Sequence, residues 1–176
     1  MQRAAAEARA REEFSGQANG CRRMGSDFTA LICELLRDRL DASSRFGARI
    51  LNWPGEPRAA AVALRAAGGL NALARSGRDR NLTALYPPNR PAPEALWRGL
   101  AHAIAEHDGF LHDYLDSAPQ TNEVRRCSVL LGGALLIASA TGLPLDVIEI
   151  GASAGLNLGF DGYRYELGGA VWGAST

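Results

Sequence analysis

Through residues 1–143, apolar side chains recur at the three- and four-residue spacing of a helix, and no segment alternates as a strand would. The spacing predicts helices over residues 1–23, 27–40, 45–53, 58–77, 91–115 and 123–142, with glycine or proline near most of their ends. The last of these is apolar around much of its circumference, which predicts a central, buried helix. We therefore expect a mainly α protein whose residues 1–143 form an N-terminal multi-helix bundle.

The pattern changes after Pro144. Four of the six residues of Leu145–Ile150 are apolar, and Asp146 and Glu149 are the exceptions. Such a short apolar run predicts a strand buried on both faces. Residues 162–173 then alternate around Gly168-Gly169, which predicts a β-hairpin. Residues 144–176 therefore read as a second domain that begins an α/β unit.

Composition excludes several classes of function. The formal net charge is zero, whereas sequence-independent nucleic-acid binders are basic, so we expect no nucleic-acid partner. The three cysteines, an odd number without CxxC spacing, favour neither a metal site nor a disulfide framework. Residues 1–13 do not resemble a signal peptide, and the apolar run Val129–Ala140 is too short to span a bilayer. We expect a cytoplasmic protein with no bound metal and no membrane partner.

The segment "EIGASAGLNL" (149–158) carries the strongest hint of chemistry. Small residues at 151, 153 and 155 let a ligand approach the backbone, and Glu149 can accept hydrogen bonds from a hydroxyl or an amine. The same spacing also serves a tightly packed strand-to-helix corner. Alternatively, Gly-x-Ser-x-Gly matches the nucleophile elbow of serine hydrolases, with Ser153 as nucleophile, although no histidine follows residue 112. No catalytic residue can be assigned from this pattern.

The acid-x-Gly-x-Ser-x-Gly spacing resembles the first motif of Rossmann-like S-adenosylmethionine-dependent methyltransferases, with Ser153 in place of the usual middle glycine. This resemblance implies S-adenosylmethionine as cofactor. It also implies a cofactor-binding loop formed by Glu149, Gly151, Ser153, Gly155 and Asn157.

A wider resemblance covers nearly the whole chain. The stretches "FSGQANGCRRMGSDFTALI" (14–32), "SGRDRNLTALYP" (76–87), "PQTNEVRR" (119–126) and "IEIGASAGLNLGFDGYRYELGG" (148–169) are similar to a bacterial family catalogued as domain of unknown function 2332. Members of that family are longer, so the resemblance implies a truncated Rossmann-like domain, of which residues 144–176 supply the first strand and the hairpin. The family name implies no activity.

Further polar residues are expected near the glycine loop. A helix over 123–142 is about 30 Å long, so its start lies far from Pro144 and, if the helix is antiparallel to the strand, near the strand's C-terminal end. That arrangement brings Asn122, Glu123 and Arg126 to the ligand side, where Asp161 and Tyr163 also follow the loop. Helix capping is the alternative role for Asn122 and its neighbours.

Three functions remain open: a methyltransferase of unknown substrate, a non-catalytic helical interaction module, or a serine hydrolase. Association is expected on two grounds. Residues 1–88 carry 14 arginines and 9 acidic residues, hence +5, and residues 89–176 carry 5 and 10, hence −5. In addition, an apolar strand flanked only by a hairpin leaves one edge open. We therefore predict a homo-oligomer, most simply a dimer that pairs through Leu145–Ile150.

Overall fold

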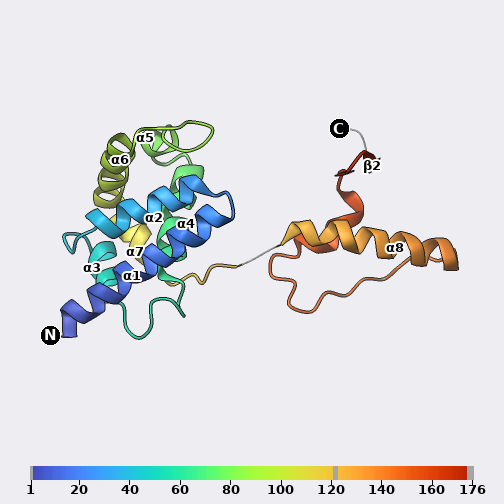
Figure 1. Cartoon of the computed structure of the whole chain (residues 1–176), viewed down its shortest axis with the longest axis horizontal. Coiled ribbons are helices and arrows are strands. Elements are labelled where there is room, and N and C mark those ends of the chain that lie inside the picture. The colour runs from blue at the N-terminus through green and yellow to red at the C-terminus, as the bar shows by residue number, and fades with distance from the viewer. Residues whose placement is uncertain (1, 121–122, 174–176) are drawn as a thin grey trace. The chain divides into compact units, whose positions relative to one another are not determined.

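The computed structural model describes residues 2–120 and 123–173 (Figure 1). The chain divides into two compact units, which we call the N-terminal unit (residues 1–119) and the C-terminal unit (residues 120–176). The sequence had placed a domain boundary at 143–144, whereas the compact units divide at Pro119 and Gln120. Among the described residues the fold is mainly helical, as expected, with one two-stranded hairpin.

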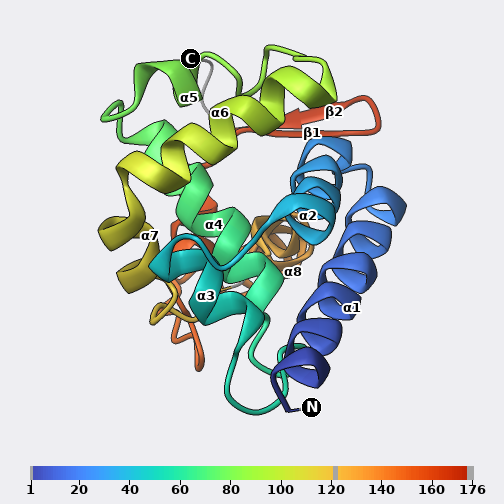
Figure 2. The ribbon, with the colours of Figure 1, turned by 90° about the vertical axis from the view of Figure 1, so that its left-hand side faces the viewer.

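The N-terminal unit is a bundle of helices. Its elements are α1 (Gln2–Arg23), α2 (Asp27–Arg39), α3 (Arg45–Leu51), α4 (Val62–Arg75), α5 (Arg80–Thr83), α6 (Pro93–Glu106) and α7 (Asp108–Tyr114). Figure 2 shows α4 near the middle of this unit, with α1 and α2 to one side and α7 to the other. Buried side chains from all seven of these helices meet in one core, among them Phe14, Leu36, Phe46, Leu70, Leu82, Leu100 and Leu111.

Two helix boundaries differ from the prediction. The helix expected over 58–77 begins only at Val62, because Ala61 adopts a left-handed conformation with φ 52° and the residues before it form turns. The single helix expected over 91–115 is broken at His107, whose φ of −117° and ψ of 26° are not helical.

The break at His107 turns Asp108 toward the start of α3. Its carboxylate accepts hydrogen bonds from the backbone N–H groups of Arg45 (3.0 Å) and Phe46 (2.8 Å). The Ser44 hydroxyl accepts a third, from the N–H of Gly47 (2.9 Å). Three of the four amides that a helix start leaves without intrahelical partners are thereby satisfied, two of them by a residue about 60 positions away.

Replacement of Asp108 by alanine should lower the free energy of unfolding of the N-terminal unit by about 1–2 kcal/mol, the usual cost of a lost helix cap. Denaturant unfolding followed by circular dichroism measures this change. Asp113→Ala is the control, because Asp113 lies on the same helix but is exposed, and its side chain pairs only with His112 among the described residues. Equal effects of the two substitutions would show that Asp108 does not hold α3.

The C-terminal unit contains η1 (Val124–Arg126), α8 (Cys127–Thr141), η2 (Leu156–Gly162), β1 (Tyr165–Leu167) and β2 (Ala170–Trp172). The predicted hairpin is confirmed: β1 and β2 pair antiparallel, with Tyr165 opposite Trp172. Its turn is Gly168-Gly169, where both glycines have positive φ. A small core joins Cys127, Leu131, Phe160 and Tyr165.

Two expectations about this unit are wrong. The segment Leu145–Ile150 is not a strand, because the sheet of the described residues contains only β1 and β2, and neither pairs with it. Nor is α8 a buried central helix, since Val129 and Leu136 are 78% and 74% exposed. An apolar pattern predicts that a segment will be buried, but it does not identify the strand or helix against which the segment packs.

One stretch of the described residues, Val124–Thr141, is long and apolar enough to cross a membrane by length and composition alone. Its mean hydropathy is 1.3, and 11% of it is buried within the unit. The core helix of a soluble protein passes the same test, so the expectation of no membrane partner stays a prediction.

Candidate functional site

A pocket of about 910 Å³ lies in the C-terminal unit, between α8 and the segment that follows it. The segment reverses direction because Gly142 ends α8 in a left-handed conformation (φ 66°) and Pro144 prevents the helix from continuing. The chain then runs back along α8 (Figure 1). The volume is in the range of small-molecule sites.

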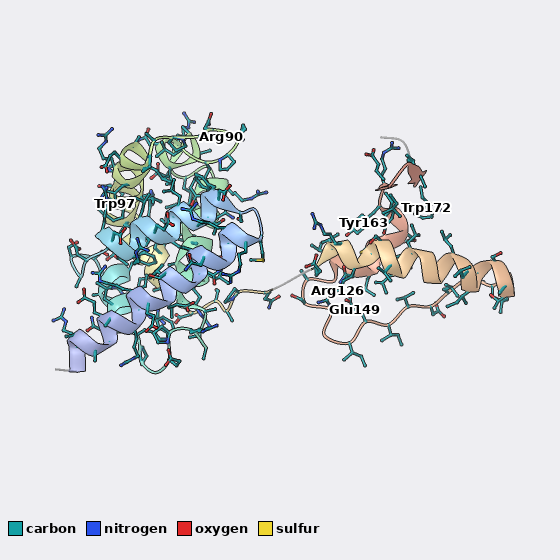
Figure 3. All side chains as sticks on the ribbon, in the orientation of Figure 1. Arg90, Trp97, Arg126, Glu149, Tyr163 and Trp172 are labelled. Carbon is teal, nitrogen blue, oxygen red and sulfur yellow. The ribbon has the colours of Figure 1, made fainter. Side chains whose placement is uncertain are left out.

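The pocket combines apolar walls with a few polar side chains. The walls are formed by Val129, Leu130, Ile137, Val147, Leu158 and Phe160, among others. The polar lining comes from Arg126, Asp146, Glu149 and Asn157. Arg126 and Glu149 lie near the start of α8 (Figure 3), and no ion pair between them forms in the described part of the chain. Apolar walls with few convergent polar groups are typical of a binding site for an organic ligand.

Glu149 is held by a short chain of hydrogen bonds. Its Oε1 accepts from the Asn157 side-chain Nδ2 at 3.0 Å. Asn157 is 4% exposed, and its Oδ1 lies 3.3 Å from the Cys127 thiol, which donates to it. Cys127, the first residue of α8, therefore orients the Asn157 side-chain amide, which in turn orients the Glu149 carboxylate.

The second carboxylate oxygen of Glu149 is the unusual feature of the site. Glu149 Oε2 is buried and accepts no hydrogen bond from any residue that the structure describes. A buried polar atom without a partner is costly, and most such atoms in proteins are satisfied. The pocket thus presents an acceptor with room for a donor from outside the chain.

The glycine loop forms a tight turn directly after Glu149. Gly151, Ser153 and Gly155 all have positive φ, at 73°, 53° and 72°. Two of these positions need glycine for that reason, and Ser153 is strained. None of the three lines the pocket; they set the path by which the chain leaves Glu149 and returns at Asn157.

Ser153 has an amide, not a base, as its partner. Its Oγ donates to Gln120 Oε1 at 2.8 Å, and an amide oxygen cannot take up the proton as the histidine of a triad does. Gln120 stands at the beginning of "PQTNEVRR", so this contact joins that segment to the glycine loop. The arrangement favours a structural role for Ser153 over a nucleophilic one.

The remaining predicted site residues are dispersed. Asp161 lines a neighbouring hollow that also contains Trp172. The Tyr163 hydroxyl donates to the backbone carbonyl of Leu156, and Glu123 is exposed just before η1. Asn122 lies outside the described residues. The structure therefore brings Arg126, Glu149 and Asn157 to one pocket, and the other predicted site residues that it describes do not line this pocket.

Sequence reasoning missed Cys127 and the apolar walls. Cys127 is 1% exposed and its contact with Asn157 spans 30 positions, so no local spacing could have indicated it. Of the other two cysteines, both buried, burial raises the pKa of the Cys33 thiol to about 12, which keeps it protonated and poorly nucleophilic.

Comparison with known proteins identifies the family. The sequence model of a family described as "uncharacterized protein conserved in bacteria (DUF2332)" matches residues 11–176, so the chain belongs to this bacterial family. No curated protein and no solved structure gives a significant match to the chain.

Proposed function

We propose that, in this member of the DUF2332 family, the pocket beside α8 binds a small organic ligand through Glu149 and that the ligand is an adenosyl compound, S-adenosylmethionine. The observation that carries the proposal is the buried, unpartnered Oε2 of Glu149. A ribose hydroxyl or an amine would supply the missing donor.

Two further features of the pocket suit such a ligand. Val129, Leu130 and Leu158 offer apolar contact to a flat aromatic base. The Arg126 guanidinium, which forms no ion pair with the described residues, can bind a carboxylate. The turn at Gly151–Gly155 resembles the cofactor loop of Rossmann-like methyltransferases in spacing. S-adenosylmethionine, when bound, supplies an electrophilic methyl group. The chain's own residues would bind and orient it, and no acceptor or general base is assigned.

Calorimetric titration of S-adenosylmethionine and S-adenosylhomocysteine into the full chain tests the proposal. We expect binding of both, weakened by about tenfold or more in Glu149→Gln, which loses the charged acceptor. Asp146→Asn is the matched control, because Asp146 lines the same pocket but is exposed and should change the affinity by less than about threefold. No heat at millimolar ligand, or equal affinities of wild type and Glu149→Gln, would remove the proposal.

The two alternative functions give different results in the same preparations. A serine hydrolase would be labelled at Ser153 by a fluorophosphonate, and we expect no labelling because Ser153 donates its hydrogen bond to Gln120. An interaction module is favoured by the exposed apolar side chains of the C-terminal unit, and it predicts association without ligand binding.

A further inference from the structure

A second pocket lies wholly within the N-terminal unit and is polar. Its volume is about 820 Å³, and it opens between one face of α1 and the segment that precedes α4. Arg9, Glu13 and Gly16 follow one another at helical spacing along that face of α1. A Cβ added at Gly16 would meet nothing within 4 Å, so the missing side chain at this position keeps the pocket open.

Glu13 lines this pocket and lacks a partner among the residues that the structure describes. It is 8% exposed, and it makes no hydrogen bond and no ion pair with the residues of the described ranges. The pKa of its carboxyl group is raised because burial disfavours the charged form, and the nearby Arg58 guanidinium offsets part of this rise. Its carboxylate oxygens are not among the fully enclosed polar atoms of the described residues, so they open to the pocket, where a donor from outside the chain can reach them.

The charges around Glu13 are balanced and unpaired. The pocket is lined by three acids and three arginines: Glu12, Glu13, Glu56, Arg9, Arg23 and Arg58. None of these six forms an ion pair within the described part of the chain. Elsewhere in the unit, arginines do find carboxylates, as in Arg22–Glu34 (2.6 Å). Arg9 and Glu13 are four positions apart but in the less favourable order for pairing along a helix.

We propose that this pocket binds a small zwitterion of the α-amino acid type. The ammonium group of such a ligand donates to the Glu13 carboxylate, and its carboxylate accepts from the guanidinium of Arg58 on the facing segment. A balanced set of opposite charges suits a ligand that carries both signs better than a polyanion or a polyamine. This site is separate from the Glu149 pocket and does not depend on the function proposed there.

The test is a ligand panel on the full chain, read by thermal shift and by calorimetry. The panel contains an acidic, a basic and an apolar L-amino acid, with spermidine as a cation-only probe and inorganic phosphate as an anion-only probe. We expect at least one amino acid to bind and to raise the melting temperature. Glu13→Gln and Arg58→Gln should each weaken that binding by about tenfold or more.

Three further variants separate a binding site from a structural role. Glu106→Gln changes an exposed acid of α6 that does not line the pocket, and it should leave the affinity within about threefold of wild type. Gly16→Leu should fill the pocket and abolish binding while the chain stays folded, because its Cβ enters open space. Glu149→Gln should leave amino acid binding unchanged, which distinguishes this site from the Glu149 pocket.

Several outcomes would overturn the proposal. These are no amino acid binding at millimolar ligand, equal affinities in wild type and Glu13→Gln, or spermidine or phosphate binding as well as the best amino acid. A higher melting temperature for Glu13→Gln with unchanged ligand affinity would show that Glu13 is only a buried structural acid.

Discussion

Replacement of Gly47 by alanine is expected to destabilise the N-terminal unit by more than about 3 kcal/mol, at the upper end of overpacking effects. Gly47 lies in the first turn of α3, and a Cβ there would come within 2.0 Å of the backbone carbonyl oxygen of Asp41. It would also lie 3.1 Å from the Ser44 hydroxyl. The clash is with backbone, so no change of rotamer relieves it.

The surroundings of Gly47 cannot shift to make room. Its N–H donates to Ser44, and the amides of the two preceding residues are held by Asp108. Phe46 and Ile50, on the same short helix, are 0% exposed in the core. Moving α3 away from Asp41 would therefore break a helix cap and open the core together.

A graded set of glycine substitutions tests this cause, with unfolding followed by circular dichroism. Gly99→Ala places a Cβ 2.1 Å from a Leu85 methyl group, the end of a side chain that can move, and should cost less than Gly47→Ala. Gly16→Ala enters open space within α1 and should stabilise by about 0.5–1 kcal/mol. A Gly47→Ala protein within about 1 kcal/mol of wild type would contradict the described packing of α3.

The sequence predicted those parts of the fold that are determined by neighbours along the chain. The hairpin was predictable because Gly168-Gly169 supplies both positive φ values of its turn. The break between α6 and α7 was not, because it depends on Asp108 at the start of α7, whose carboxylate caps α3 about 60 residues away. The strand at Leu145–Ile150 was expected from its composition, yet a strand exists only where a second one pairs with it.

The candidate site likewise contains some residues that could be expected from the sequence and others that could not. The resemblance to a methyltransferase loop led us to expect Glu149 and Asn157 in one site, and their side chains are hydrogen-bonded to each other. The role of Cys127 depends on α8 and the returning chain lying side by side, which no local pattern encodes. The unpaired Glu13 was missed because a single acid among the many charges of α1 reads as a solvated residue, and only its 8% exposure shows otherwise.

The second large expected effect concerns self-association of the C-terminal unit. This unit exposes what we call the C-terminal apolar face, formed by Val129, Leu136, Leu143, Ile148 and Ile150, each more than half exposed. Ile148 and Ile150 are 90% and 98% exposed. Burial of each such side chain is worth about 1.5–3 kcal/mol, so the face strongly favours a partner.

A second copy of the chain is the partner that this face fits best. Leu145–Ile150 is an apolar segment that pairs with no strand among the described residues, and two such segments can pair with each other about a twofold axis. Backbone hydrogen bonds and apolar contacts would then be satisfied in one closed, isologous interface. We therefore expect the protein to be a dimer at micromolar concentration.

Sedimentation of the wild-type protein at micromolar concentration tests whether it is a dimer. Ile148→Lys is the test variant and Met24→Lys is the control. The lysine at 148 introduces a charge at the centre of the pairing segment and should disperse the dimer, while circular dichroism stays unchanged. Met24 is 75% exposed but lies in the N-terminal unit, so the same substitution there should leave the dimer intact. A single species at 18.7 kDa for the wild type would contradict self-association. A different outcome would assign the face to a membrane. In that case wild-type monomers would bind neutral lipid vesicles, and Leu136→Lys would abolish the binding, because Leu136 lies within the stretch of membrane-spanning length, Val124–Thr141.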